Sequence, residues 1–239
     1  SESCLTDKNG FSIEEKNPFY GEYTFHYWLW KNYLNKIETQ WVGFCQYRKF
    51  FVKNKILNNN IKINELKESL FRNVDEIDSS YDCVLGEKFS VRNFKLSKIF
   101  KHHFIEFITN PNILINKNKR NIKFHFDLFH GKGNLDDAID LLDDENKNSF
   151  KNFVTSETAF NPHNMFLCKT NILKSYYDVI FPWLERCEEI FGFKDTKDYG
   201  LKRIYGFLAE RFLSFWFTKN YKVKELPIVG KDLSDYKNF

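Results

Sequence analysis

Paired cysteines are missing from this sequence. Its five cysteines stand at positions 4, 45, 83, 168 and 187, and none forms a Cys-x-x-Cys pair. Cys45, Cys83 and Cys168 lie inside apolar runs, as small buried hydrophobic residues do. This usage fits a reducing compartment and provides neither a disulfide framework nor a cysteine-based zinc site.

Long apolar runs and several well-known catalytic motifs are also absent. No stretch reaches the roughly 20 apolar residues of a transmembrane helix, and no signal peptide is visible. A Ser-His-Asp order, a nucleophile elbow and an HExxH motif are missing, which argues against a hydrolase. Gly131-Lys132-Gly133 lacks the spacing of a phosphate-binding loop.

A concentrated charge of one sign is absent as well. The 36 Lys and Arg residues exceed the 32 Asp and Glu residues by four, and lysine is spread along the chain. Nucleic-acid binders usually concentrate positive charge in a patch, so we expect no nucleic-acid partner. A solvated lysine surface explains the balance, and a modest basic surface would also suit the anionic inner leaflet of a membrane.

Aromatic residues, in contrast, are abundant. They make up 18% of the 239 residues, and 27 of them are phenylalanine. A chain of this length and composition can bury a substantial core. Since neither an internal repeat nor a convincing linker is visible, we expect a single domain over residues 1–239.

The stretch 17–51 predicts a helix followed by a strand. Asn17 is a suitable N-cap and Pro18 suits a first helical turn, so we expect a helix that continues to Leu34. The apolar run 41–45 is typical of a strand buried on both faces. The polar residues that follow, at 46–49, should emerge at its carboxyl end, where open α/β sheets bind ligands.

Further elements alternate along the chain. The patterns predict an α/β fold in which helices flank a mixed, mostly parallel sheet. We expect residues 150–160 to be connecting structure and Pro227 to restrict the last strand to an edge. The expected helices are 61–73, 94–107, 136–144, 171–191 and 203–219; the expected strands are 81–86, 163–168 and 223–229; the expected loop insertion is 108–122.

Glu210 and Arg211 are the most informative charges, because the helix around them is apolar on almost every side. A buried charge needs a partner or a cavity. The two residues are interpreted either as a buried ion pair that fixes packing or as a carboxylate that faces a pocket and acts as a general base. The sequence leaves both readings open.

Other candidates also have two interpretations. Arg48 at its strand end could bind phosphate oxygens bidentately or pair with Glu22. His26, one helical turn after Glu22, is expected to be a satisfied core residue rather than a ligand. Asp136 and Asp137 are explained by the dipole of their helix or by a solvated face better than by a metal site.

Several segments together resemble one bacterial family, the small capsular-polysaccharide glycosyltransferases filed as domain-of-unknown-function 4422, which are galactofuranosyltransferase-like sugar transferases. They run in the family's order, whereas residues 87–160 match poorly. The matching segments are EKNPFYGEYT at 15–24, YWLWKN at 27–32, VGFCQYRKFF at 42–51, NMF at 164–166, GFLAERFL at 206–213 and VKELPIV at 223–229.

The resemblance implies a type-A glycosyltransferase fold and a transferase that moves a sugar from a nucleotide-sugar donor, a UDP-sugar, to a growing surface saccharide such as capsule or lipopolysaccharide. The acceptor would be a saccharide or a lipid-linked saccharide. The implied location is cytoplasmic, with a peripheral association at the inner face of the membrane. The alternative is a non-catalytic carbohydrate-binding or scaffold domain of a larger synthase.

The resemblance also assigns roles to individual residues. Glu210 would deprotonate or hold the acceptor hydroxyl, with Arg211 orienting it. His130 and Asp136 correspond to a family His-x-x-x-Asp-Leu segment, with an insertion between them, and are secondary candidates near the acceptor. The residues expected on the donor side are Glu22, Tyr47, Arg48, Lys49 and Asn164.

Two departures from the family pattern change these expectations. The family's histidine at the strand end is Gln46 here, so no acid/base role is available at that position. The family usually begins with a strand and a Thr-His-Lys segment that is not found before Ser1, so we expect that the first strand is lacking or that this part of the site is built differently.

No Asp-x-Asp follows the helix–strand unit, where metal-dependent members of this fold hold a divalent cation. We therefore expect transfer without a metal, with Arg48 and Lys49 neutralising the leaving diphosphate. Dependence on Mn²⁺ or Mg²⁺ is the alternative.

Overall fold

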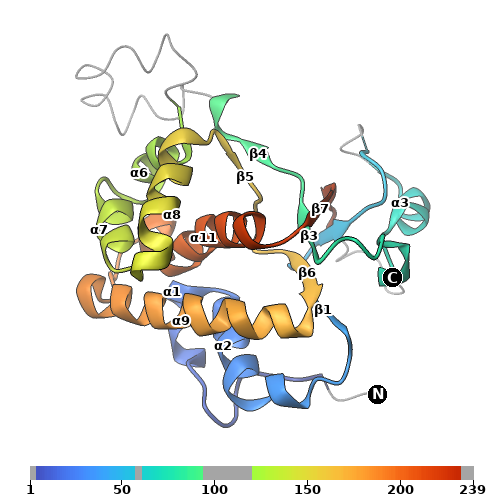
Figure 1. Ribbon diagram of the computed structural model, residues 1–239, viewed down its shortest axis with the longest axis horizontal. Helices are drawn as coiled ribbons and strands as arrows, with labels where there is room; N and C mark the ends of the chain where they lie inside the picture. Colours follow the sequence, from blue (N-terminus) through green and yellow to red (C-terminus); the bar gives the residue numbers. More distant parts are fainter. Residues whose placement is uncertain (1–3, 57–60, 94–119, 233–239) are drawn as a thin grey trace.

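A four-stranded sheet lies at the centre of the fold. A computed structural model describes residues 4–56, 61–93 and 120–232 (Figure 1). The strand order of the sheet is β1-β6-β3-β7. Its strands are β1 (Trp41–Phe44), β6 (Phe166–Lys169), β3 (Cys83–Gly86) and β7 (Val223–Leu226).

The predicted α/β architecture is confirmed, but the predicted direction of the strands is not. β6 runs antiparallel to both of its neighbours, β1 and β3, whereas β3 and β7 are parallel. The described sheet is therefore mixed and not mostly parallel. The reason is that β6, which comes late in the chain, inserts between β1 and β3 and separates two strands that are consecutive in the expected order.

The burial of β1 also differs from the expectation. β1 is an edge strand whose Gly43 is exposed and whose other residues are only partly buried, whereas all four residues of β3 are buried. An apolar run does not reveal whether a strand lies at the edge or in the centre of a sheet. β7 lies at the opposite edge, as Pro227 predicts.

Two short antiparallel pairs complete the described strands. β2 (Lys49–Phe51) pairs with β8 (Ile228–Gly230), which joins the end of the 17–51 stretch to the end of the described chain. β4 (Phe89–Ser90) pairs with β5 (Ala159–Phe160).

The helix expected from Asn17 is divided in two. Gly21, with φ of +62°, ends α1 (Asn17–Tyr20) before α2 (Tyr23–Asn32) begins. A positive φ of this size favours glycine, because other residues clash with their own backbone there. The break places Glu22 at the joint between the two helices.

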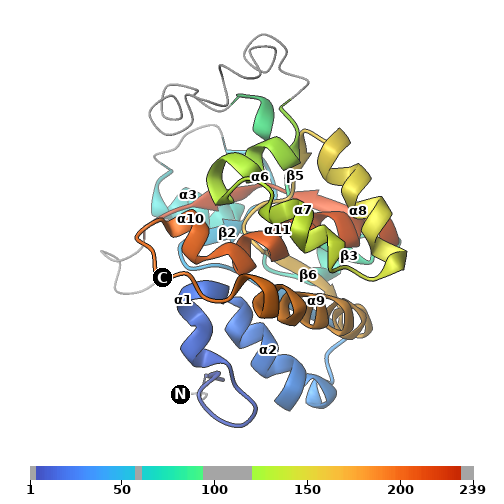
Figure 2. The ribbon, with the colours of Figure 1, turned by 90° about the vertical axis from the view of Figure 1, so that its left-hand side faces the viewer.

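The central helix is α11 (Ile204–Asn220), as the sequence predicts. It packs against α9 (Thr170–Phe191) and α1 on one side and against α6 and α8 on the other (Figure 1). Figure 2 shows the group of helices α6 to α8 from its outer side. The remaining helices of this region are α6 (Ile122–His130), α7 (Asn134–Asp140), α8 (Asp144–Ser156) and α10 (Tyr199–Lys202).

One connecting segment was assigned wrongly from the sequence, because most of 150–160 belongs to α8 and β5. The expected helix 94–107 and residues 108–119 of the expected insertion 108–122 lie outside the described residues, and Ile122 is the first residue of α6. The insertion stays a prediction. The helix expected at 61–73 is α3 (Ile63–Ser69), and short 3-10 turns cover 14–16, 34–36, 74–76 and 91–93.

One large hydrophobic core joins the helices to the sheet. It includes residues of α1, α2, α6, α7, α8, α9 and α11 and of the sheet, among them the fully buried Trp183 of α9 and Phe166 of β6. His26 belongs to this core, as expected: its side chain is 2% exposed and its Nδ1 lies 2.8 Å from the hydroxyl of Tyr177. The division of the chain into domains stays a prediction.

Candidate functional site: three adjoining cavities

The turn after β1 places two predicted residues side by side. The backbone N–H of Lys49 donates to the carbonyl of Gln46 at 3.1 Å, and Arg48 within this turn has φ of +64°. The ammonium of Lys49 then donates to the side-chain oxygen of Gln46 at 3.0 Å. The turn therefore holds the two side chains against each other, and both are partly buried.

A strained segment precedes β6. His163 and Asn164 have φ values of +81° and +53°, a backbone conformation that residues other than glycine rarely adopt. Such strain persists only where surrounding contacts enforce it, and it clusters at functional sites. Here the amide of Asn164 donates to the carboxylate of Glu22 at 2.9 Å and to the carbonyl of Gly206 at 3.2 Å.

Glu22 is the point at which three segments meet. One oxygen of its carboxylate accepts hydrogen bonds from Gln46 at 2.7 Å and from Asn164 at 2.9 Å. The other oxygen lies 3.5 Å from the guanidinium of Arg203. Glu22 therefore holds the β1 turn, the strained segment and the start of α11 together.

Lys49 contacts the strained segment directly. Its ammonium lies 2.7 Å from Nδ1 of His163. Burial, and to a smaller extent the charge of Lys49, lowers the pKa of His163 to about 4, and burial lowers the pKa of Lys49. The imidazole is therefore neutral near pH 7, and its Nδ1 accepts a hydrogen bond from the ammonium.

Glu210 and Arg211 form the ion pair that the sequence predicts as one of two alternatives. The carboxylate of Glu210 pairs with the guanidinium of Arg211 and also accepts the backbone N–H of His163. Arg211 is 2% exposed, and its guanidinium lies 4.1 Å from the ring centroid of Phe160. Glu210 also lines two cavities, so the same carboxylate belongs to the ion pair and faces a pocket; its role as a general base stays a prediction.

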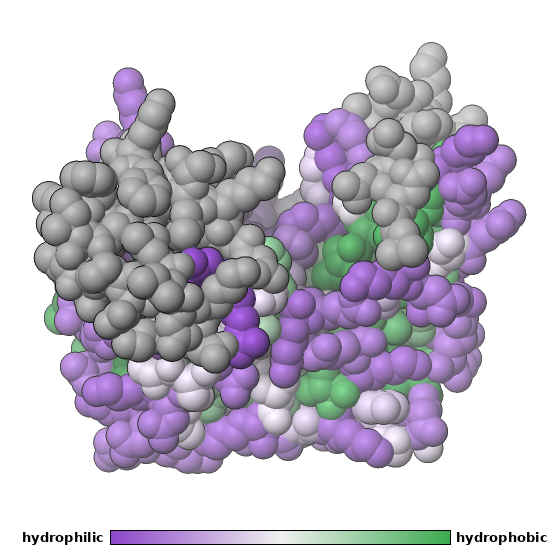
Figure 3. Space-filling model, turned by 90° about the horizontal axis from the view of Figure 1, so that it is seen from above, coloured by the Kyte–Doolittle hydropathy of each residue, from purple (hydrophilic) through white to green (hydrophobic). Residues whose placement is uncertain are grey.

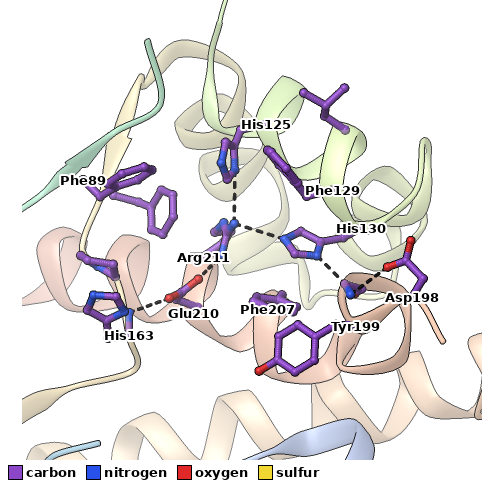
Figure 4. A pocket seen from close by; sticks show the side chains of 14 residues that line it. Phe89, His125, Phe129, His130, His163, Asp198, Tyr199, Phe207, Glu210 and Arg211 are labelled. Atoms are coloured by element: carbon purple, nitrogen blue, oxygen red, sulfur yellow. Dashed lines mark hydrogen bonds and ion pairs between the residues drawn. The ribbon is translucent and has the colours of Figure 1, made fainter. Parts of the chain in front are cut away.

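Two histidines flank Arg211 (Figure 4). Its second amino group lies 3.4 Å from Nδ1 of His125 and 3.4 Å from Nε2 of His130. Burial and the charge of Arg211 lower the pKa of His125 to about 3 and hold the pKa of His130 well below its ordinary value. Nδ1 of His130 therefore donates to the carbonyl of Gly200 at 3.2 Å, and its Nε2 accepts from Arg211.

Three cavities adjoin one another around these residues. A small polar cavity of about 150 Å³, which we call the central cavity, lies between two larger ones. It shares Gln46 and Lys49 with a cavity of about 630 Å³, the β1 cavity. It shares His163, Tyr199, Phe207 and Glu210 with a cavity of about 850 Å³, the aromatic cavity.

The two larger cavities differ in character. The aromatic cavity has several rings in its wall, including Phe89 and Phe129 (Figure 4). Phe160 also lines it. The β1 cavity is lined by Tyr47, Arg48 and Arg72 and by apolar side chains of β2 and the segment after α3. Figure 3 shows apolar side chains at the surface in patches on the right-hand side, the side on which α3 lies in Figure 1.

Most of the predicted site residues are brought together, with one correction in geometry. Arg48 and Glu210 do not face each other across one cleft: Arg48 lines the β1 cavity and pairs with Asp232 at 2.8 Å, whereas Glu210 lines the other two. Arg48 does not pair with Glu22. Lys49, and not Arg48, lines the central cavity with Glu210, together with Arg203.

The remaining predicted residues are divided. His130 lines the aromatic cavity, and Glu22, Gln46 and Asn164 line the central one. Tyr47 lines the β1 cavity, where its ring is 78% exposed and lies against the guanidinium of Arg48. Asp136 lies on α7, pairs with Lys123 at 2.8 Å and lines none of the three cavities.

Sequence reasoning missed several residues of the site. Among them, His125, His163, Tyr199 and Arg203 line the cavities, and none of these four belongs to a recognisable motif. The Asn-Pro-His-Asn segment at 161–164 carried the one available signal, since a polar cluster directly before a buried strand is a position for ligand contacts.

The described residues contain neither a cluster of metal ligands nor a helix that could span a membrane. Within the described residues, no three His, Cys, Asp or Glu side chains are grouped so that they could hold a metal ion. The predicted independence of metals is untested. Among the described helices, none has both the length and the apolar character needed to cross a bilayer.

Comparison with known families shows to which family this chain belongs. A family model described as a domain of unknown function, DUF4422, matches residues 1–221. The chain belongs to the DUF4422 family. The match confirms the family that the sequence motifs resemble, and a search of curated proteins finds no match.

A solved structure shares the fold of this DUF4422 chain. It is the apo structure of the WbbM bifunctional glycosyltransferase, which superposes with a TM-score of 0.70 at 22% sequence identity. The match covers 95% of this chain and 39% of that chain, so this chain spans about two fifths of the length of its structural neighbour. The fold of this chain is therefore one that is also found in a glycosyltransferase.

Proposed function

We propose that this DUF4422 chain is a glycosyltransferase of the hexosyltransferase type that moves a sugar from a UDP-sugar to a growing surface saccharide, such as capsule or lipopolysaccharide. The observation that supports this most is the position of Lys49 and Glu210. A cation and a carboxylate line one small cavity, and each also lines one of the two larger cavities. Sugar transfer needs such an arrangement, because two large substrates must meet at one reacting carbon.

The donor nucleotide is assigned to the β1 cavity. Its lining offers the exposed ring of Tyr47 for stacking on a base and the guanidinium groups of Arg48 and Arg72 for phosphate oxygens. Lys49 stands where this cavity meets the central one. The ammonium would stabilise the charge that develops on the diphosphate as it leaves.

The acceptor is assigned to the aromatic cavity. Phe89, Phe129 and Phe160 in its wall offer flat apolar surfaces for the faces of sugar rings. Glu210 lies at the boundary with the central cavity, where an acceptor hydroxyl would reach the donor sugar. Arg211 and the backbone N–H of His163 fix the orientation of the carboxylate.

The reaction then follows from these positions. The acceptor oxygen forms a bond with the anomeric carbon, the bond from that carbon to the diphosphate breaks, and the electron pair leaves with UDP. Glu210 takes the hydroxyl proton as general base. Arg211 is a positioning residue in this scheme, and His125 and His130 position Arg211 through its second amino group.

Transfer without a metal is part of the proposal, with Lys49 and Arg48 balancing the diphosphate charge. Activity that disappears with EDTA and returns with Mn²⁺ or Mg²⁺ would show that this part is wrong. Asp136 and Asp137 would then be the first ligands to examine. A cytoplasmic location at the inner face of the membrane, with a lipid-linked saccharide as acceptor, completes the proposal.

The first experiment measures binding and turnover separately. UDP and a panel of UDP-sugars are titrated into the protein by calorimetry, and UDP release is followed in the presence of short saccharide acceptors. Donor binding with UDP release supports the transferase. Binding of saccharides alone supports the alternative, a carbohydrate-binding or scaffold domain of a larger synthase.

A further inference from the structure

Asn164, which lines the central cavity, has a buried polar atom without a partner. Asn164 is 5% exposed, and both hydrogen bonds of its side chain are made by the amide nitrogen, to Glu22 and to Gly206. Its Oδ1 is one of two buried side-chain atoms without a hydrogen-bond partner in the described part of the chain. Buried acceptors are nearly always satisfied, so this oxygen indicates a missing donor.

The backbone around Asn164 holds this oxygen in place. The positive φ values of His163 and Asn164 cost free energy that neighbouring contacts must offset. Glu22 and Gly206 hold the amide on one side, and the backbone N–H of His163 is held by Glu210 on the other. The carbonyl oxygen is therefore preorganised for a donor group that enters the cavity.

The charge of the lining selects against a phosphate. Of the described residues that line the central cavity, Lys49 and Arg203 are cations, and Glu22 and Glu210 are carboxylates. A phosphate in this cavity would meet two carboxylates and an unpaired carbonyl oxygen, all of which are acceptors. A hydroxyl group can donate to that oxygen and also accept from Lys49, so a neutral group with several hydroxyls fits better.

The size of the cavity limits the ligand to a single ring. Its volume is about 150 Å³. A cavity of about 150 Å³ in another protein holds one benzene ring. The space therefore suits one sugar unit and is too small for a nucleotide.

From these observations we infer that the central cavity binds the transferred sugar ring itself, and that Asn164 Oδ1 selects the donor by accepting a hydrogen bond from one hydroxyl of that ring. The inference rests on the proposed function and goes beyond it, because it separates the sugar subsite from the diphosphate subsite. Lys49 marks the boundary between them, since it lines both cavities.

The test compares the contribution of the sugar to binding in two variants. Asn164→Gly removes the oxygen, and glycine adopts a φ of +53° without strain. Asn161→Gly is the matched control, because it removes another buried asparagine side chain of the same segment that lines none of the three cavities. The ligands are UDP, UDP-glucose, UDP-galactose and UDP-N-acetylglucosamine, followed by the monodeoxy analogues of the tightest binder, with thermal unfolding as the check of folding.

The expected result is specific to the sugar. Asn164→Gly should bind UDP within about twofold of the wild-type affinity but the best UDP-sugar about tenfold more weakly, the size of one net hydrogen bond. One deoxy analogue should bind about tenfold more weakly than its parent in the wild type and in Asn161→Gly, and as well as its parent in Asn164→Gly.

Two other results would overturn the inference. If Asn164→Gly lowers the affinity for UDP and for the UDP-sugar equally, the diphosphate lies in the central cavity. If neither affinity changes, Asn164 does not take part in recognising the sugar. In each case the transferase proposal would survive. If the wild type binds neither UDP nor any UDP-sugar, the proposed function falls and this inference falls with it.

Discussion

The ammonium of Lys49 lies 2.7 Å from Nδ1 of His163, although 114 residues separate them in the chain. His163 in turn donates its backbone N–H to Glu210, so one histidine touches both the cation and the carboxylate of the candidate site. Because burial and Lys49 lower the pKa of His163 to about 4, the ring stays neutral and does not neutralise Glu210. The contact therefore fixes the distance between the proposed donor and acceptor sides.

Replacing Glu210 by glutamine tests the proposed base. Glu210→Gln removes the proton acceptor, so UDP release with a saccharide acceptor should fall by roughly 10²-fold or more. Affinity for UDP should remain within about twofold, because Lys49 and Arg48 are untouched. Turnover is measured as UDP released per minute, and unchanged turnover would remove Glu210 from the mechanism.

A matched variant separates chemistry from stability. Glu210→Gln leaves the buried Arg211 without a counter-charge, a loss of about 3–5 kcal/mol in comparable buried pairs. Glu210→Asp keeps that charge and withdraws the carboxylate by one methylene group. It should therefore restore much of the stability while turnover remains low, because the base is displaced.

Lys49 and Arg48 are neighbours with different surroundings, so they should differ in binding. Lys49→Ala removes a half-buried cation that lines two cavities, whereas Arg48 is exposed and already paired with Asp232. Calorimetric titration with UDP should show a larger loss of affinity for Lys49→Ala than for Arg48→Ala. A larger loss of affinity for Arg48→Ala would show instead that Arg48 is the main diphosphate ligand.

Gly21 links the fold to the site. Its φ is +62°, and a Cβ added there would lie 2.0 Å from the guanidinium of Arg203. Gly21→Ala should therefore destabilise the protein by about 1–3 kcal/mol through strain and also displace Arg203 from Glu22. We expect a lower melting temperature and slower UDP release.

Gly192 provides the matched control. Its φ is +60°, yet a Cβ there would meet nothing within 4 Å among the described residues. Gly192→Ala should lower the melting temperature by a similar strain but leave UDP release unchanged. Equal activities of the two alanine variants would show that Arg203 does not support the site.

Acid should destabilise this protein through its buried histidines. Burial lowers the pKa of His26 to about 3 in the folded state, below the ordinary value of 6.5. Between these two values the unfolded chain binds the proton and the folded chain does not. The contribution of His26 is therefore fully present above pH 6.5 and is lost as the pH falls from 6.5 toward 3.

Urea unfolding between pH 7 and pH 4 measures this contribution. His26→Gln should reduce the slope of unfolding free energy against pH by up to about 1.4 kcal/mol per pH unit, the value for one proton. His125 and His163 contribute in the same direction, so part of the slope remains. An unchanged slope in His26→Gln would contradict the neutral, buried state of this ring.

The sequence predicted the elements whose pattern is strong. α9 is long and its apolar residues repeat with a helical period, α11 is long and apolar on almost every side, and both appear nearly where expected. α8 was missed because its segment is mostly polar: Phe150 and Val154 are its buried apolar residues. Packing against α11 stabilises α8, although the sequence of α8 has too few apolar residues to show a helical pattern.

The site was predicted in part for a similar reason. Residues inside motifs, such as Lys49, Asn164 and Glu210, could be named from the sequence. The partners of those residues could not, because His125, His163 and Arg203 reach the site only through the antiparallel entry of β6 and the packing of α6 and α10 around α11. The outward direction of Arg48 depends on a single backbone angle, which no sequence pattern reports.

A crystal structure with the tightest-binding UDP-sugar tests the central claim most directly. The account predicts that the diphosphate oxygens lie within hydrogen-bond distance of Lys49 Nζ, with the sugar ring in the central cavity and its anomeric carbon facing the side of Glu210. A nucleotide bound outside the three cavities, or a sugar ring directed away from Glu210, would contradict it.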